Sequence, residues 1–359
     1  MKRNILLNPG PATTTDTVKQ ALMVPDICPR EEEFGELTQS VLKKIVEVVN
    51  GESTHSTVIF AGSGTAGVEA ALCSVVPENG KILILDNGAY GKRAETIIQA
   101  YGISHRTIRI EWGDFPDISQ IETVIKEESK LTHFFFVHHE TTTGMLNPLA
   151  EILELCEKYE LDSIVDAMSS YAGLPIDLQR QPIDYLISSS NKCIQGMAGV
   201  SFVIANKERL KATSNVQPRN LYLNLWGNHS YIEQTGQFQF TPPVQIVYAL
   251  DQALDEFFKE TQSGRTARYL RSYETLLEGI EQTGLEMLLP ESQHSKLLTA
   301  IVEPKSAKYN FKEMHDHFYE NDVTIYPGKG ANKDTFRIAN IGAIDYRDMK
   351  VFKDHKSVV

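Results

Sequence analysis

Basic residues are scarce in this sequence, since 35 lysines and arginines face 47 aspartates and glutamates, a net charge of −12. This deficit leaves no basic face for a nucleic-acid backbone or an anionic membrane, so a small-molecule partner is expected. The four cysteines form no Cys-x-x-Cys pair, and no stretch approaches the roughly 18–20 apolar residues of a membrane span. The N-terminal apolar run is too short for a signal peptide. We therefore expect a reduced, cytoplasmic protein.

The composition is otherwise that of an ordinary folded protein. Hydrophobic residues make up 42% of the 359 residues and charged residues 23%, which excludes disordered, collagen-like and disulfide-scaffold classes. At roughly 100–200 residues per domain, this length suggests two domains.

Apolar runs of strand length alternate with segments of helical periodicity through the N-terminal part of the sequence. The expected strands are 56–60, 81–85, 104–110, 133–138, 163–165, 184–188 and 200–205, and the expected helices between them include 67–76, 92–101, 118–128 and 149–159. Parallel strands need long crossover connections, so this alternation predicts an α/β domain with a mainly parallel sheet covered by helices.

The pattern changes after about residue 243. Long amphipathic helices are expected at 244–260 and 265–283, a further helix at 311–320, and strands at 285–289, 297–302, 323–326 and 336–341. This order predicts a smaller α+β C-terminal domain with an antiparallel sheet.

A glycine-rich loop, Ala61-Gly62-Ser63-Gly64-Thr65-Ala66-Gly67, joins the first expected strand to a helix. Free amides at the start of a helix favour an anion, and the hydroxyls of Ser63 and Thr65 add two donors, which suits a phosphate monoester. The glycines also match Gly-x-Gly-x-x-Gly, and Asp86 closes the next strand at the spacing of a dinucleotide fingerprint. A dinucleotide site and a purely structural turn therefore stay open.

Two charged residues follow strands further along the chain, Asp166 after 163–165 and Lys192 after 184–188. Ligands of open α/β sheets bind outside the carboxyl ends of strands, although an aspartate there can instead cap a helix. A lysine taken alone is usually solvated, but desolvation beside an apolar strand lowers its pKa and frees a neutral amine. An anion cup, a carboxylate and an amine are the groups that pyridoxal phosphate requires.

Lesser features fit the same site or a structural role. Tyr90 could stack on a planar ring or pack in the core. Arg337, inside an apolar strand, could bind a carboxylate or phosphonate with its planar fork or form an internal salt bridge. His138 and His139 are neighbours on a strand and point to opposite faces, so they cannot chelate one metal, and no metal site is predicted.

With these residues in place, the chain resembles the fold-type I, class V aminotransferases that depend on pyridoxal phosphate. More narrowly, it is similar to the 2-aminoethylphosphonate–pyruvate transaminases. The resemblance covers nearly the whole chain and rests on residues 7–11, 62–64, 87–91, 139–148, 165–170, 184–196, 326–329 and 336–338.

The resemblance implies a set of cofactor contacts, which are Ser63, Gly64 and Thr65 for the phosphate, Thr141 for the ring hydroxyl, Tyr90 for stacking, Asp166 for the ring nitrogen and Lys192 for the covalent attachment. It further implies that Arg337 anchors the acidic end of the substrates. Thr241 would reach the cofactor phosphate of a neighbouring subunit, because active sites in this family lie at a homodimer interface.

The implied reaction transfers the amino group of 2-aminoethylphosphonate to pyruvate and gives phosphonoacetaldehyde and L-alanine, a step of phosphonate degradation. Two alternatives stay open: another class V small-acid transaminase, such as an alanine–glyoxylate or serine–pyruvate enzyme, and a nicotinamide-dependent oxidoreductase that uses the loop 62–67. We expect the chain to divide into an N-terminal segment lining the active site (1–14), a large cofactor-binding domain (15–260) and a small C-terminal domain (261–359).

Overall fold

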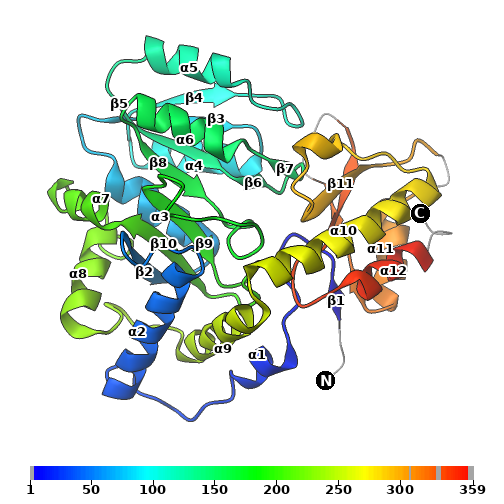
Figure 1. Cartoon of the computed structure of the whole chain (residues 1–359), viewed down its shortest axis with the longest axis horizontal. Coiled ribbons are helices and arrows are strands. Elements are labelled where there is room, and N and C mark those ends of the chain that lie inside the picture. The colour runs from blue at the N-terminus through cyan, green and yellow to red at the C-terminus, as the bar shows by residue number, and fades with distance from the viewer. Residues whose placement is uncertain (1–3, 307–308, 329–332, 355–359) are drawn as a thin grey trace.

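The computed structural model describes residues 4–306, 309–328 and 333–354. A seven-stranded sheet forms the centre of the larger part of the molecule (Figure 1). The strand order is β2-β10-β9-β8-β5-β3-β4. The strands are β2 (His55–Ala61), β3 (Lys81–Asp86), β4 (His105–Arg109), β5 (Leu131–Val137), β8 (Asp162–Asp166), β9 (Tyr185–Ser189) and β10 (Val200–Asn206). Only β10 runs against its two neighbours, so the prediction of a mainly parallel sheet is confirmed.

The sheet separates two hydrophobic cores, and this explains the near-continuous apolar strands. In β5, Phe134 and Phe136 enter one core while Phe135 and Val137 enter the other, because successive side chains of a strand point to opposite faces. One face is covered mainly by α3 (Gly64–Val75), α4 (Ala89–Ala100), α7 (Lys207–Ala212) and α8 (Leu225–Thr235). The other is covered by α2 (Glu32–Glu47), α5 (Ile118–Glu127), α6 (Leu149–Lys158) and α9 (Val244–Glu260). The α/β prediction is confirmed.

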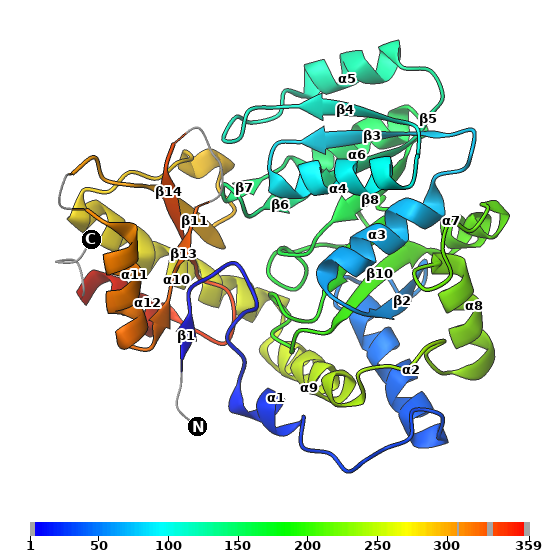
Figure 2. The ribbon, with the colours of Figure 1, turned by 180° about the vertical axis from the view of Figure 1, so that it is seen from behind.

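The elements after α9 form a second, smaller layer beside the large sheet, with the long helix α10 (Gln262–Thr283) running between the two parts (Figure 2). Its antiparallel sheet has the order β11-β14-β13. These strands are β11 (Leu298–Val302), β13 (Tyr326–Pro327) and β14 (Thr335–Ala339). Side chains of α10, α11 (Phe311–Glu320) and α12 (Tyr346–Asp354) fill its core. An antiparallel sheet in this part of the chain was predicted and is confirmed.

Two expected strands of this layer differ from the structure. Residues 285–289 make a single bridge, between Met287 and Ile301, because Pro290 and a 3₁₀ turn at Glu291–Gln293 end the extended run. Residues 323–326 divide between two sheets. There, β12 (Val323–Thr324) pairs in parallel with the N-terminal strand β1 (Ile5–Leu6), and β13 pairs with β14.

None of the helices in the described part of the chain combines the length and apolar character that a membrane crossing requires.

Candidate active site

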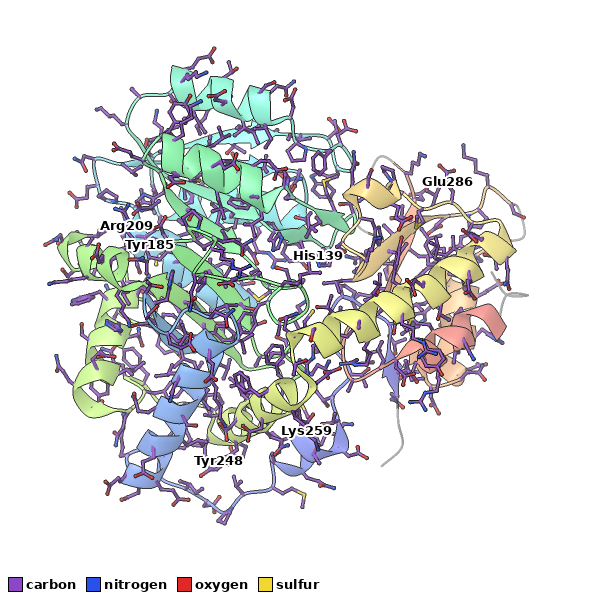
Figure 3. All side chains as sticks on the ribbon, viewed as in Figure 1. His139, Tyr185, Arg209, Tyr248, Lys259 and Glu286 are labelled. Carbon is purple, nitrogen blue, oxygen red and sulfur yellow. The ribbon has the colours of Figure 1, made fainter. Side chains whose placement is uncertain are left out.

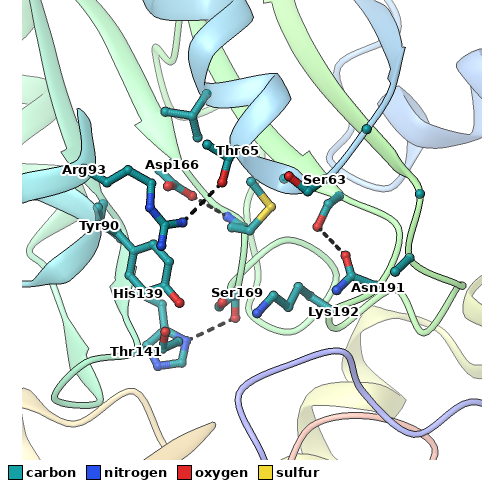
Figure 4. A pocket seen from close by; sticks show the side chains of 18 residues that line it. Ser63, Thr65, Tyr90, Arg93, His139, Thr141, Asp166, Ser169, Asn191 and Lys192 are labelled. Carbon is teal, nitrogen blue, oxygen red and sulfur yellow. Dashed lines mark hydrogen bonds between the residues drawn. The ribbon is translucent and has the colours of Figure 1, made fainter. Parts of the chain in front are cut away.

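A cavity of about 450 Å³ lies at the ends of β5, β8 and β9, beside the loop that leads from β2 into α3 (Figure 4). These strands run parallel to β2, so the loops that follow all four meet at one edge of the sheet. The cavity brings together the predicted residues Ser63, Gly64, Thr65, Tyr90, Thr141, Asp166 and Lys192.

The glycine-rich loop gives the cavity a wall of hydrogen-bond donors. Ser63 is the N-cap residue of α3, yet its side chain makes no capping hydrogen bond, so the hydroxyl is free to bind a ligand. The first amides of a helix lack intrahelical partners and carry partial positive charge. A Cβ at position 64 would lie 2.5 Å from the Met168 sulfur, so glycine leaves room for this side chain, which also lines the cavity.

Asp166 ends β8 and is 4% exposed. Burial raises the pKa of its carboxyl to about 6, while a hydrogen bond from the Met168 amide and the positive charges of Lys192 and Arg93 oppose the rise. The Met168 N–H donates to Oδ1 at 2.9 Å, which fixes the carboxyl in orientation. A carboxyl held in this way is set to pair with a cationic group of a ligand.

Lys192 follows β9, and its side chain enters the same cavity. Burial lowers the pKa of its ammonium to about 8, against the opposing influence of Cys193 and Asp166. Its Nζ donates to the Pro9 carbonyl oxygen at 2.6 Å. The amine is therefore more readily available in its neutral, nucleophilic form than that of a solvated lysine.

The N-terminal segment before α1 (Asp16–Gln20) holds this lysine in place, although the two are distant in sequence. The Ala12 amide donates to the Asn191 carbonyl at 2.9 Å, next to Lys192 in sequence. Gly10 has a φ of 135°, and a Cβ there would lie within 2.7 Å of Lys192 Cε. Only glycine combines this conformation with so close an approach.

Tyr90 and Arg93 enter the cavity from the first two turns of α4. The Arg93 guanidinium lies 4.9 Å from the centre of the Tyr90 ring, and its Nη1 donates to Thr65 Oγ1 at 3.2 Å. A cation over a ring stabilises both side chains. Arg93 thus links the aromatic wall of the cavity to the glycine-rich loop, and sequence reasoning did not single it out.

Thr141 lines the cavity, whereas Arg337, which contacts the Thr141 backbone, does not. The Thr141 hydroxyl is buried and has no hydrogen-bond partner among the described residues, while its carbonyl accepts from Arg337 Nη1 at 3.0 Å. Arg337, 2% exposed, also donates from Nε and Nη2 to the Pro327 carbonyl. Its partners are carbonyls rather than a carboxylate, so the guanidinium charge is not neutralised by these contacts.

His139 also lines the cavity and was considered in the sequence only as a metal ligand. Its Nδ1 donates to the Ser169 carbonyl at 3.1 Å, and its Nε2 accepts from the Ser295 hydroxyl at 2.8 Å. Burial lowers the pKa of this imidazole to about 3. His139 is therefore a neutral wall residue at the junction between the large sheet and the C-terminal elements (Figure 3).

Three residues of interest do not line the cavity, namely Arg337, Thr241 and Asp86. Thr241 is exposed and does not line the cavity of this chain. Asp86, the acid of the dinucleotide alternative, ends β3, which β10, β9, β8 and β5 separate from β2. The described residues contain no group of three or more His, Cys, Asp or Glu that could hold a metal. Lys329, in the motif 326–329, lies outside the described residues.

Comparison with known proteins identifies the relatives of this chain. Residues 21–321 match the model of the family described as Aminotransferase class-V. A 2-aminoethylphosphonate–pyruvate transaminase of Pseudomonas fluorescens (strain Pf0-1) is 38% identical over 347 residues, which cover 96% of this chain and 94% of the relative. One of Klebsiella pneumoniae subsp. pneumoniae is 39% identical over 343 residues, 95% of this chain and 93% of the relative.

A solved structure shares the whole fold. The crystal structure of alanine–glyoxylate aminotransferase from Nostoc sp. matches with a TM-score of 0.91 and 24% sequence identity, over 99% of this chain and 95% of the other.

Proposed function

This chain belongs to the class-V aminotransferases, and from that membership we propose that it transfers the amino group of 2-aminoethylphosphonate to pyruvate. The products are phosphonoacetaldehyde and L-alanine, in a step of phosphonate degradation. Relatives with this activity match the chain over almost its full length. The meeting of Lys192, Asp166 and the loop residues 62–65 in one cavity supports amino transfer, and the relatives support the choice of substrates.

The enzyme depends on pyridoxal phosphate, as its family does, and the cavity fits this cofactor. The uncapped Ser63 hydroxyl and the free amides after it suit a phosphate group, and the unpartnered Thr141 hydroxyl provides a donor for the ring oxygen. When bound, the cofactor supplies a conjugated ring that takes up the electron pair released from a C–H bond of the amino donor.

Lys192 has two roles in the proposed mechanism. Because burial favours the uncharged amine, its Nζ would hold the cofactor covalently. With the amino donor bound, the same Nζ would accept the proton from the carbon that bears the donor's amino group and later give it up, as a general base and then a general acid.

Asp166 has an electrostatic role. Its buried carboxylate lies at the end of β8, where it would pair with the ring nitrogen of the cofactor and favour the protonated form of that nitrogen. A fixed negative charge in a site shielded from water acts more strongly than the same charge in solvent. Asp166 would therefore stabilise the transition state more than the ground state.

Arg337 is proposed to bind the acidic end of each substrate. A guanidinium fork matches both the carboxylate of pyruvate and the phosphonate of the donor, and burial strengthens this attraction. Burial lowers the pKa of Arg337, which reflects the cost of keeping its charge out of water. An arriving anion relieves that cost.

The pH dependence of cofactor uptake follows from Lys192. Because burial brings its pKa to about 8, the neutral amine becomes more abundant as the pH rises through that value. The rate at which the apoenzyme takes up pyridoxal phosphate is expected to rise with pH and to be half-maximal near pH 8. Stopped-flow absorbance measures this rate, and a midpoint at the ordinary lysine value of 10.5 would rule out the perturbed amine.

Gly10→Ala is expected to lower the transamination rate on the order of 10²-fold, because the new Cβ displaces the Lys192 side chain from its place in the cavity. Steady-state rates and thermal melting are measured together. The matched control is Gly102→Ala, a glycine whose added Cβ meets nothing within 4 Å. If Gly10→Ala kept normal turnover, the close approach to Lys192 would have no functional meaning.

We further propose a homodimer with shared active sites, in which Thr241 contacts the cofactor phosphate of the other subunit. Thr241 is exposed and does not line the cavity of its own chain, which agrees with a role toward a second chain.

We also propose a cytoplasmic location and a division of the chain into three parts, with the boundaries 1–14, 15–260 and 261–359.

The function is tested by incubating the holoenzyme with 2-aminoethylphosphonate and pyruvate. Phosphorus NMR and amino-acid analysis are expected to show phosphonoacetaldehyde and alanine appearing in equal amounts. Alanine with glyoxylate, and serine with pyruvate, serve as competing substrate pairs. Turnover of either pair without turnover of the phosphonate would identify another small-acid transaminase.

The oxidoreductase alternative is not favoured. A dinucleotide fingerprint requires its acidic residue near the glycine loop, at the end of an adjacent strand. Here Asp86 ends a strand that four others separate from β2, and it does not line the cavity. The spacing in sequence matched this fingerprint, but the order of strands in the sheet does not.

A further inference from the structure

Glu140 is a buried carboxyl group that none of the roles above uses. It ends the two-residue strand β6 (His139–Glu140), which pairs with β7 (Met145–Leu146). Its exposure is 0%, and its hydrogen-bond partners are two backbone amides and one hydroxyl rather than a cation. Burying a carboxyl without a cation is unfavourable, so its presence beside the cavity calls for a physical reason.

The Glu140 side chain joins two segments that are distant in sequence. Its Oε1 accepts from the Thr142 amide at 2.9 Å and from the Thr142 hydroxyl at 2.6 Å. Its Oε2 accepts from the Tyr90 amide at 3.3 Å. The Thr142 hydroxyl in turn accepts from the Ala89 amide at 3.0 Å, so Glu140 and Thr142 together satisfy the first two amides of α4.

Helix α4 lacks a cap of its own, because Gly88 occupies the N-cap position and has no side chain. A side chain at position 88 would collide with Glu140, so glycine at this position leaves the space that the Glu140 carboxyl occupies. An acceptor with negative charge is most favourable at the start of a helix, where the free amides and the helix dipole are positive. The loop after β6 therefore caps α4 from outside the helix.

The residues fixed by this cap are those that face the cofactor in the proposed function. Tyr90 belongs to the capped turn, and Thr141 lies between Glu140 and Thr142 with its carbonyl on Arg337. We propose that Glu140 is a positioning residue that holds Tyr90 and Thr141 at a fixed separation in the cavity. This inference rests on the proposed function and adds a residue that acts on the site through others.

The hydrogen-bond pattern favours the ionised carboxylate, since each of the three groups donates a hydrogen to Glu140. Burial raises the pKa of this carboxyl to about 7, and Asp166 adds to the rise while the Thr142 and Tyr90 donors oppose it. In Glu140→Gln, the amide oxygen can still accept from Thr142, but the amide nitrogen then meets the Tyr90 N–H, donor against donor.

The test compares Glu140→Gln with the wild-type enzyme in three measurements. Cofactor affinity of the apoenzyme is expected to weaken about tenfold, the equivalent of one lost hydrogen bond to a charged group. The kcat is expected to fall with little change in the KM for pyruvate, since Arg337 keeps its own contacts. The apoenzyme Tm is expected to change little, because the substitution also removes a buried charge.

Two threonine variants provide a second test in the same loop. Thr142→Val removes the hydroxyl that bridges Glu140 and Ala89, and it is expected to weaken cofactor affinity several-fold. Its matched control is Thr143→Val, because the Thr143 hydroxyl is buried with no partner among the described residues. Equal cofactor affinities for these two variants, or wild-type affinity in Glu140→Gln, would overturn the positioning role.

A lower apoenzyme Tm in Glu140→Gln with unchanged cofactor affinity would likewise overturn it and leave only a structural role. The cofactor-affinity readout does not depend on which amino donor the enzyme uses. An error in the proposed substrate would appear instead as a wild-type enzyme that does not turn over 2-aminoethylphosphonate, whatever the Glu140 variants show.

Discussion

Lys192→Ala is expected to lower the rate of amino transfer by at least about 10⁴-fold, because it removes both the covalent attachment and the general base. The purified variant is also expected to lack the visible absorbance of covalently bound cofactor after dialysis. Both effects follow from one buried amine whose pKa is lowered to about 8 and which lies in the same cavity as Asp166.

Lys126→Ala is the matched control for this variant, since Lys126 is an exposed lysine of α5 whose ion pair with Glu122 lies on the surface. It is expected to keep full activity and full colour. A coloured, active Lys192→Ala enzyme would assign the covalent attachment to another lysine.

Asp166→Ala is expected to reduce kcat by about 10²–10³-fold, the range measured when one preorganised electrostatic group is removed from an active site. The variant still has Lys192, so the cofactor is expected to bind covalently, although more weakly. Single-turnover absorbance measurements with 2-aminoethylphosphonate separate the slowed proton transfer from the weaker binding. Asp166→Asn is expected to lose a similar factor, because it keeps the shape and removes the charge.

Asp162→Ala is the control at the other end of the same strand. Asp162 begins β8 and pairs with Arg209 at 3.2 Å, away from the cavity lining. This variant is expected to lower stability and to leave kcat unchanged. Near-normal turnover of Asp166→Ala would contradict the electrostatic role assigned to that carboxylate.

The convergence of Asp166 and Lys192 could be predicted from the sequence because it follows from topology. Each residue comes directly after an apolar run of strand length, and the carboxyl ends of parallel strands meet at one edge of a sheet. The glycine loop after β2 was predicted to reach this edge for the same reason. Periodicity in the sequence was therefore enough to place these parts of the site.

Contacts between distant segments could not be predicted in this way. The Pro9 carbonyl that holds Lys192 lies 183 residues away in sequence, and no local pattern marks it. Arg93 does not come directly after a strand, and in the sequence it cannot be distinguished from any exposed arginine of a helix. His139, by contrast, could have been predicted as a site residue. It lies two residues after the end of β5, at the same edge of the sheet as Asp166, which ends β8.

Some secondary structure was also missed. Helix α2 was not predicted, although its buried residues Phe34, Val41, Leu42 and Ile45 recur with helical spacing. The short strand β1 carries two residues, which is too few for any alternation to show. It is stabilised by pairing with β12 across the whole chain, and that pairing is a property of the tertiary structure.

Borohydride reduction of the holoenzyme followed by peptide mass mapping tests most directly whether the amine, the carboxylate and the glycine loop serve one ligand. Reduction makes the bond between cofactor and lysine permanent, so the modified residue can be located. A pyridoxyl group is expected on the peptide that contains Lys192, with no modification elsewhere. Modification of a different lysine, or of none, would contradict the assignment of these three groups to one ligand.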